Sequence, residues 1–194
     1  MRVRYNAPFT LTFSLVCSLV LVLDQFLVPH LISSYFTVGG QGSFRPEDPW
    51  SWWRLVSYTF GHAGWDHFLG NLSFILLLGP ILEEKYQSPT ILVMAIITAI
   101  ATGLINTFLF STTLLGASGI VFLLIILVSF ANIRSGEIPL SFVGVIVLFL
   151  GKEILDAFKN DNVSQFAHIV GGTLGALFGF VAIRFQDSPE KSIP

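Results

Sequence analysis

The sequence predicts an all-α membrane protein with six transmembrane helices, and three observations lead to this fold class. Hydrophobic residues make up 53% of the 194 residues and charged residues only 11%, whereas a soluble globular domain carries about 25% charged residues. The hydrophobic residues gather in six stretches of spanning or near-spanning length, for which about 20 residues are needed. Most links between the stretches are short. We therefore expect a single membrane domain over residues 1–194, without a soluble appendage or an internal repeat.

The predicted spans, in chain order, are Phe9–Leu27, Phe68–Leu82, Thr90–Phe110, Ser118–Ile133, Leu140–Leu155 and Val163–Phe185. The first span follows Met1-Arg2-Val3-Arg4, an arrangement that also begins secretory signal peptides. The span is long, however, and no Ala-x-Ala cleavage site follows it. We therefore interpret it as a retained helix.

Two segments lie outside these spans and differ in character. Residues 28–66 are rich in glycine, proline and aromatic residues, among them Trp50, Trp52, Trp53 and Trp65. Tryptophan is enriched where chain meets the headgroup zone, so we expect a long outer loop lying partly in the membrane interface. Residues 186–194 are polar and are predicted to form a loose cytoplasmic tail.

The distribution of lysine and arginine predicts the orientation. With the N-terminus in the cytoplasm, six of these residues lie inside and four outside, and positive charge is commoner on the cytoplasmic side. We therefore expect a multi-pass protein of the cell membrane with a cytoplasmic N-terminus. The net charge of −2 argues against a nucleic-acid partner, and the single cysteine, Cys17, excludes a disulfide framework and a thiolate metal cluster. No cofactor and no metal is expected.

The fourth span is short, and this places Ser118 below the membrane surface. Residues 118–133 make a helix of about 24 Å, against a hydrocarbon core of about 30 Å. If the cytoplasmic end reaches the surface, residues 111–115 must dip into the membrane before the helix begins. Irregular backbone at that depth is tolerated only where protein buries it or where it lines a wet cavity. Ser118 is therefore predicted to lie submerged beside water.

The second, fourth and sixth spans all run in the same direction, so their first residues share the outer leaflet. This parity brings together four polar residues that are far apart in sequence: His67, Asn71, Ser118 and His168. Each has a simpler explanation, because small residues around a serine suit helix packing, an asparagine can bond a neighbouring helix, and a histidine suits an interface. Intramembrane ionisable residues are costly, and the four together indicate a functional site opening toward the outer face.

Four further motifs stand out in the sequence: Trp53-Arg54, the spacing His62-(x4)-His67-(x3)-Asn71, Gly116-Ala117-Ser118-Gly119, and Ala167-His168-(x2)-Gly171-(x3)-Gly175. Together they resemble the motifs of the rhomboid family of intramembrane serine proteases. The resemblance covers essentially the whole six-helix core and also includes Glu83 after the second span.

The resemblance implies a catalytic Ser-His dyad of Ser118 and His168. It also implies an oxyanion hole formed by His67, Asn71 and the backbone N–H of Ser118. His62, Gly116, Phe122 and Gly171 are expected to support the site. Phe122 departs from the family, which often has tyrosine there. The phenylalanine ring can still stack on His168 but lacks the hydroxyl.

The residue types agree with this chemistry. A serine hydroxyl is a poor nucleophile until a nearby base takes its proton, and His168 is the plausible base at that depth. The sequence thus predicts hydrolysis of a peptide bond in or near a transmembrane helix of membrane-protein substrates. One alternative is an inactive rhomboid-like binder or chaperone, which would be expected to have lost Ser118 or His168. Another is a metal or proton carrier using His62, His67 and His168, but carboxylates along a pathway are missing.

Overall fold

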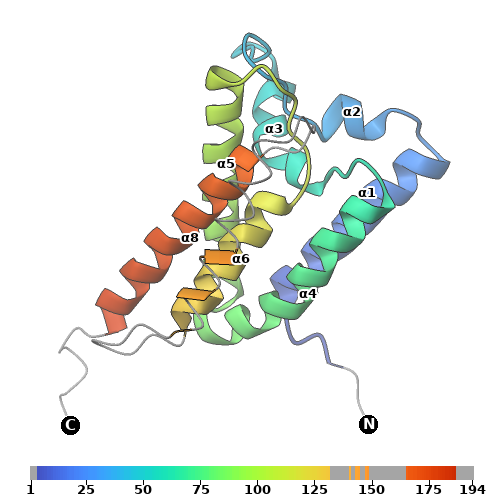
Figure 1. Ribbon diagram of the computed structural model, residues 1–194. Helices are drawn as coiled ribbons and strands as arrows, with labels where there is room; N and C mark the ends of the chain where they lie inside the picture. Colours follow the sequence, from blue (N-terminus) through green and yellow to red (C-terminus); the bar gives the residue numbers. More distant parts are fainter. Residues whose placement is uncertain (1–3, 132–139, 141–142, 145–146, 149–164, 187–194) are drawn as a thin grey trace.

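The computed structural model describes residues 4–131, 140, 143–144, 147–148 and 165–186, and these residues are mainly helical. The elements, in order, are α1 (Pro8–Phe26), α2 (Leu31–Tyr35), α3 (Pro49–Ser57), the 3₁₀ turn η1 (Tyr58–Phe60), α4 (Trp65–Tyr86), α5 (Ser88–Leu109), α6 (Ser118–Ala131) and α8 (Gln165–Gln186) (Figure 1). The predicted all-α class is therefore confirmed. Most of the fifth predicted span, Leu140–Leu155, and residues 187–194 of the predicted tail lie outside the described residues.

Among the described residues, three helices, α1, α4 and α5, are long and apolar enough to cross a membrane, and α6 and α8 carry shorter apolar stretches. These five helices agree with the first four predicted spans and the sixth, but the helix ends differ. The second span was expected to begin at Phe68, whereas α4 begins at Trp65 and continues to Tyr86. Hydropathy detects only the apolar part of a helix, and α4 carries polar residues in its first and last turns.

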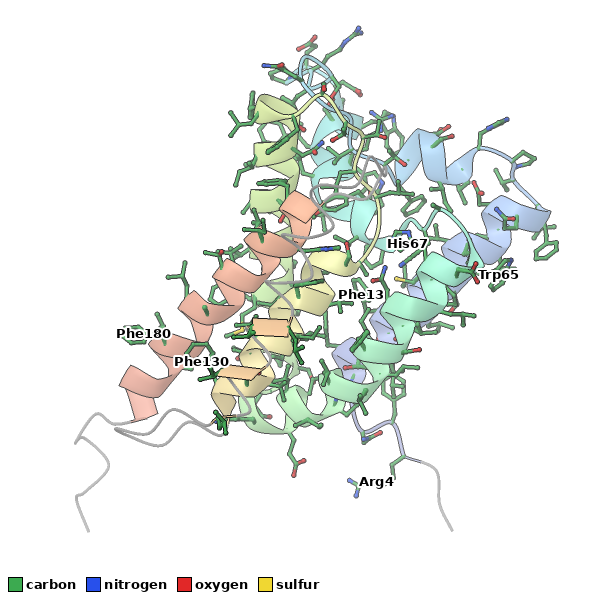
Figure 2. The ribbon with its side chains drawn as sticks, viewed as in Figure 1. Arg4, Phe13, Trp65, His67, Phe130 and Phe180 are labelled. Carbon is green, nitrogen blue, oxygen red and sulfur yellow. The ribbon has the colours of Figure 1, made fainter. Side chains whose placement is uncertain are left out.

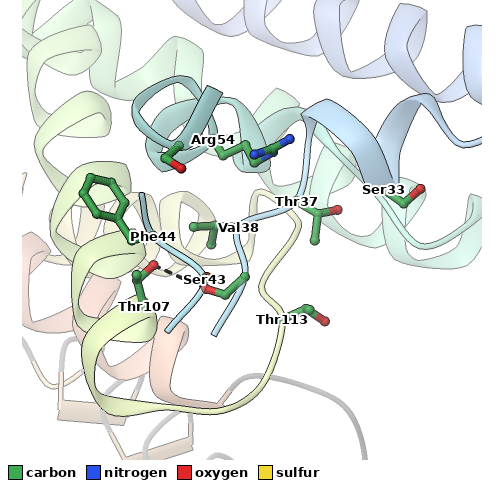
Figure 3. Close-up of a pocket in the computed structure, with 10 residues that line it drawn as sticks. Ser33, Thr37, Val38, Ser43, Phe44, Arg54, Thr107 and Thr113 are labelled. Atoms are coloured by element: carbon green, nitrogen blue, oxygen red, sulfur yellow. Dashed lines mark hydrogen bonds between the residues drawn. The ribbon is translucent and has the colours of Figure 1, made fainter. Parts of the chain in front are cut away.

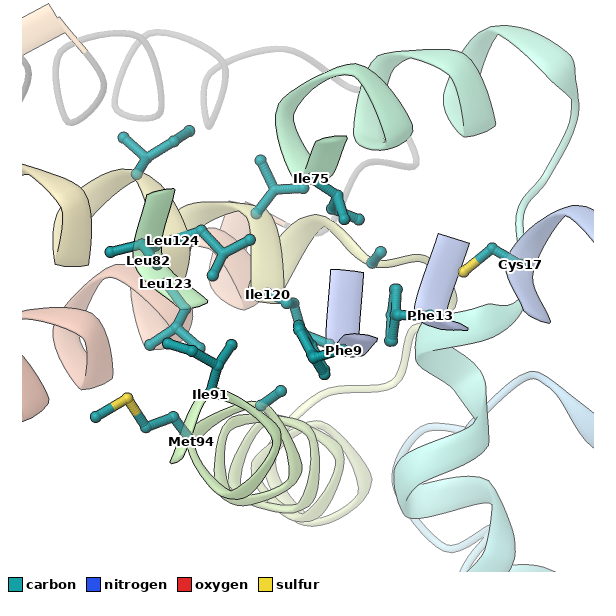
Figure 4. Close-up of a cluster of buried hydrophobic side chains, with 14 of the residues drawn as sticks. Phe9, Phe13, Cys17, Ile75, Leu82, Ile91, Met94, Ile120, Leu123 and Leu124 are labelled. Atoms are coloured by element: carbon teal, nitrogen blue, oxygen red, sulfur yellow. The ribbon is translucent and has the colours of Figure 1, made fainter. Parts of the chain in front are cut away.

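Helix α6 occupies the centre of the bundle and packs most extensively against α8 and then α4. Its residues Leu123, Leu124 and Leu127 are fully buried, and they join a cluster to which α1, α4 and α5 contribute Cys17, Ile75 and Ile91 (Figure 4). A helix that is hydrophobic on all sides is typical of a buried position. The position of α6 thus follows from its composition.

Glu83 near the end of α4 caps the first turn of α1. Its Oε2 accepts a hydrogen bond from the backbone N–H of Phe9 at 2.9 Å, and its Oε1 accepts from the N–H of Thr10 at 2.8 Å and from the Thr10 hydroxyl at 2.6 Å. The residue before α1 is Ala7, which has no side-chain acceptor for these donors. Glu83 supplies the missing acceptors and places negative charge at the positive end of the helix dipole. This carboxylate ties α1 to α4.

Residues 28–66, predicted as a long loop, contain α2, α3 and η1 and are held by specific hydrogen bonds. Asp24 Oδ1 accepts from the N–H of Ile32 at 2.8 Å and so caps α2. The Arg54 guanidinium on α3 donates from Nε and Nη2 to the carbonyl of Ser34, at 2.9 and 2.7 Å. The segment is therefore folded, and the side chains of its four tryptophans are exposed.

Candidate active site

Ser118 is the first residue of α6, as the sequence predicted, and its depth in the membrane stays a prediction. After α5 ends, residues 110–117 run back toward the middle of the bundle before α6 starts (Figure 1). Val38 and Leu114 exchange backbone hydrogen bonds of 3.0 and 2.9 Å, and the N–H of Gly116 donates to the Tyr58 carbonyl at 2.9 Å. These bonds fix the irregular segment, and they leave Ser118 half-buried at the first position of the helix.

Gly116 joins this segment to α4. Its φ of +114° lies in the region that favours glycine. A Cβ atom at Gly116 would lie 2.6 Å from Cε1 and 2.7 Å from Nε2 of His67, and 3.7 Å from Nδ2 of Asn71. The absent side chain therefore lets the backbone two residues before Ser118 lie directly against both residues that were predicted to form the oxyanion hole.

His67 and Asn71 lie one turn apart on α4 and present N–H groups toward this contact; Figure 2 labels His67 near the start of α4. The backbone N–H of Ala63 donates to Nδ1 of His67 at 3.4 Å. Because Nδ1 accepts, the neutral ring carries its proton on Nε2, the atom that faces Gly116. The Asn71 amide nitrogen is buried and has no hydrogen-bond partner among the described residues. Nε2–H of His67 and the amide of Asn71 are thus two donors beside the segment that leads to Ser118.

His62 lies behind His67 and is buried. The two rings meet edge to face with centroids 5.1 Å apart, and Nδ1 of His62 lies 3.2 Å from the Phe60 carbonyl. Burial, together with the nearby His67, lowers the pKa of His62 to about 4. His62 is therefore neutral at physiological pH, and its ring supports His67 by packing.

His168 lies over the first turn of α6. Its ring stacks on Phe122, with centroids 4.3 Å apart and planes inclined by 5°. Phe122 is four residues after Ser118, so the two side chains share one face of α6. The predicted stacking is confirmed, and it fixes the plane of the imidazole next to the helix that carries Ser118.

Glycines of α8 allow this close approach of α6 and α8. A Cβ atom at Gly171 would collide with the carbonyl oxygen of Gly119 and lie 2.8 Å from its carbonyl carbon. A Cβ atom at Gly175 would lie 2.8 Å from the Leu123 carbonyl oxygen, and one at Gly179 would lie 2.5 Å from the Phe130 ring. These three glycines of α8 therefore pack against α6.

Polar residues on α5 were not assigned to the site from the sequence. Thr98, Thr102 and Asn106 recur every four residues, are at most 1% exposed, and each has a side-chain oxygen with no hydrogen-bond partner among the described residues. Thr102 lies beside Gly119, and the Asn106 amide donates to the Thr112 carbonyl at 2.9 Å. Their spacing within an apolar span was the signal that could have revealed them, because buried polar groups in lipid need partners.

The chain was compared with known proteins. The family model described as "Rhomboid domain" matches residues 49–185. Rhomboid-related protein 1 of Caenorhabditis elegans is 34% identical over 162 residues, which cover 76% of this chain and 44% of that protein. The putative rhomboid protease YdcA of Bacillus subtilis is 30% identical over 143 residues, covering 70% of each chain. The rhomboid protease GlpG of Haemophilus influenzae is 24% identical over 137 residues, covering 69% of this chain and 71% of the other.

Proposed function

Since the chain belongs to the rhomboid family and is an integral membrane protein, we propose that it is an intramembrane serine protease. It hydrolyses a peptide bond in or near a transmembrane helix of other membrane proteins. Ser118 is the nucleophile and His168 the base. His67 and Asn71 are the side-chain donors of the oxyanion hole.

One observation supports this proposal above the others: two groups of residues meet at the start of α6. On one side, His168 stacks on Phe122, one turn after Ser118. On the other side, His67 and Asn71 contact Gly116, two residues before Ser118. A base and a pair of donors close to one serine are the parts that acyl transfer requires.

The chemistry follows from these positions. His168 removes the proton from the Ser118 hydroxyl as the oxygen attacks the scissile carbonyl carbon. The carbonyl oxygen becomes negatively charged, and Nε2–H of His67 and the amide of Asn71 stabilise it together with the Ser118 backbone N–H. His168 then gives the proton to the leaving amine as the C–N bond breaks, and Ser118 is left as an acyl ester. In the second half of the reaction His168 takes a proton from a water molecule that attacks this ester, and it returns that proton to the Ser118 oxygen as the carboxylic acid leaves. Stacking on Phe122 keeps the imidazole in one plane during these transfers.

A fluorophosphonate probe tests the nucleophile directly in membranes. The wild-type chain should become labelled at Ser118, and Ser118→Ala should lose the label. Ser129→Ala is the matched control, because Ser129 lies on the same helix and only bonds back to the Ile125 carbonyl at 3.0 Å. Labelling that persists in Ser118→Ala would contradict the assignment. A wild-type chain that neither labels nor cleaves a single-span substrate would support the inactive binder.

We also propose that the N-terminus is cytoplasmic and that the site opens toward the outer face. In a Cys17→Ser background, a membrane-impermeant thiol reagent should label Ser43→Cys from outside. It should label Ser192→Cys only after the membrane is opened. The reverse pattern would invert the orientation and place the cleavage site in the other leaflet.

A further inference from the structure

A pocket of about 230 Å³ lies away from Ser118, between the α2–α3 segment and the turn after α5 (Figure 3). Hydroxyl groups dominate its wall, and they come from Ser33, Thr37, Ser43, Ser51, Thr107 and Thr113. Thr107 is buried, and its hydroxyl donates to the Gly39 carbonyl at 3.3 Å, which ties the end of α5 to the pocket floor. The wall therefore mixes hydroxyl groups with a larger apolar surface, and it is anchored to two parts of the fold.

Arg54 is the single charged residue among the ten described residues that line the pocket. Figure 3 shows its guanidinium extending from α3 toward the side where Thr37 lies. Nε and Nη2 each donate one hydrogen bond to the Ser34 carbonyl, and Nη1 lies 3.7 Å from Asp48. A guanidinium has five N–H groups, so donors on Nη1 and Nη2 are still available. The lining thus combines positive charge with hydroxyl donors, which suits an anion.

The surroundings of the pocket indicate where such an anion comes from. The exposed aromatic side chains of Tyr35, Trp50 and Trp52 lie around it. Tyr35 packs against Trp50 with ring centroids 4.8 Å apart, and Trp52 packs at 5.1 Å against Phe44, which lines the pocket. Aromatic residues of this kind are enriched at the level of the lipid headgroups. The commonest anion at that level is the phosphate of a phospholipid, and arginine with hydroxyl donors is a typical phosphate-binding set.

We propose that this pocket binds a phosphate group, and that a phospholipid headgroup supplies it. The phosphate oxygens accept hydrogen bonds from Nη1 and Nη2 of Arg54 and from the hydroxyls of Ser43 and Thr113, because the Thr37 hydroxyl already donates to the Ile32 carbonyl at 3.0 Å. The ligand thereby bridges α3 to the turn after α5. The site is separate from the proposed catalytic residues, and its test depends on binding alone.

The tryptophans provide the readout, because all four lie at residues 50–65. The purified full-length chain in neutral detergent is titrated with dihexanoyl-phosphatidylglycerol, kept below its micelle concentration, while tryptophan fluorescence is recorded. A parallel titration uses dihexanoyl-glycerol, which lacks the phosphate, and a third uses inorganic phosphate. We expect a saturable change with the phospholipid only.

A matched pair of variants then locates the site. Thr113→Glu places a negative charge in the pocket wall and should weaken phospholipid binding at least tenfold. Ser111→Glu places the same charge in the same turn on an exposed residue that does not line the pocket, and it should change binding less than twofold. Arg54→Gln should weaken binding as Thr113→Glu does. Because Arg54 also donates hydrogen bonds to the Ser34 carbonyl, this variant could act through the fold, and the comparison of Thr113→Glu with Ser111→Glu is therefore the decisive test.

Three results would overturn the proposal. Equal affinity of Thr113→Glu and Ser111→Glu would show that the lipid binds elsewhere. An equal response to dihexanoyl-glycerol would show that the phosphate group is not recognised. Saturation by inorganic phosphate at the same concentration would overturn the lipid as the source of the ligand.

Discussion

A methyl group added at Gly171 should separate α6 from α8 and slow proteolysis, although residue 171 carries no reactive group. The added Cβ atom would lie 2.8 Å from the carbonyl carbon and 3.0 Å from the Cα of Gly119. Carbon atoms in contact normally lie about 3.5–4.0 Å apart. Both partners are backbone atoms, so no side chain can rotate away. The helices must therefore move apart by at least about 0.7 Å, and further to clear the Gly119 carbonyl oxygen.

This displacement acts where Ser118 and His168 must meet, because Gly119 follows the serine and Gly171 lies one turn after the histidine. A misplacement of about 1 Å can cost about 100-fold in rate. We therefore expect Gly171→Ala to lower kcat at least about tenfold. Overpacking costs about 1–3 kcal/mol of stability, and the better helix propensity of alanine returns about 1 kcal/mol. The variant should fold with slightly lowered stability.

Gly172→Ala is the matched control on the next residue of α8. Its added Cβ atom would lie 3.6 Å from Cγ1 of Ile126, an ordinary contact. This variant makes the same helix-propensity gain without wedging the helices, so both activity and thermal stability should equal or exceed those of the wild type. The measurements are cleavage rate of a single-span substrate and thermal unfolding of each purified variant. A Gly171→Ala protein as active and as stable as Gly172→Ala would refute the reasoning.

Other changes test other parts of the structure. Asn71→Ala should lower kcat by about 100- to 1000-fold with little change in KM, because the lost hydrogen bond strengthens only as the oxyanion forms; a change confined to KM would make Asn71 a binding residue. Glu83→Gln should lower the free energy of unfolding by about 2–3 kcal/mol through loss of charge-assisted bonds to α1, whereas Glu84→Gln, on an exposed neighbour, should change stability little. Phe122→Ala should lower kcat while Phe122→Tyr keeps it, as steady-state kinetics would show; equal kcat in both would mean that the ring does not orient the base.

The sequence predicted the helical class and most of the helices because apolar stretches near 20 residues long have few other interpretations. It also predicted that a helix would begin at Ser118, as α6 does; the depth of this residue below the membrane surface stays a prediction. The contact of His67 and Asn71 with Gly116 agrees with the parity argument, which needed only the direction of each helix. The catalytic roles of these residues, and the span expected at Leu140–Leu155, stay predictions.

Other features could not be read from the sequence, because they depend on contacts between distant residues. Glu83 and Thr10 are more than 70 residues apart in sequence. No local sequence pattern therefore predicts that a carboxylate near the end of α4 caps α1. The α2–α3 segment was expected to be a loop because its helices are short and its glycines and prolines numerous. Its order comes from Arg54, Asp24 and similar tertiary contacts, which hydropathy does not register.

Because other helices surround α6, its length does not have to match the thickness of the bilayer. The described part of α6, Ser118–Ala131, has 14 residues and extends about 21 Å, some 9 Å less than a typical hydrocarbon core. A lipid-exposed helix this short would thin the bilayer or tilt its neighbours, at a cost that rises with each ångström of mismatch. Residues 123–127 of α6 are buried by other helices instead, and the 22-residue helices α4 and α5 face the lipid with full-length apolar surfaces. Protein packing therefore sets the depth of Ser118, and the same depth should persist in membranes of different thickness.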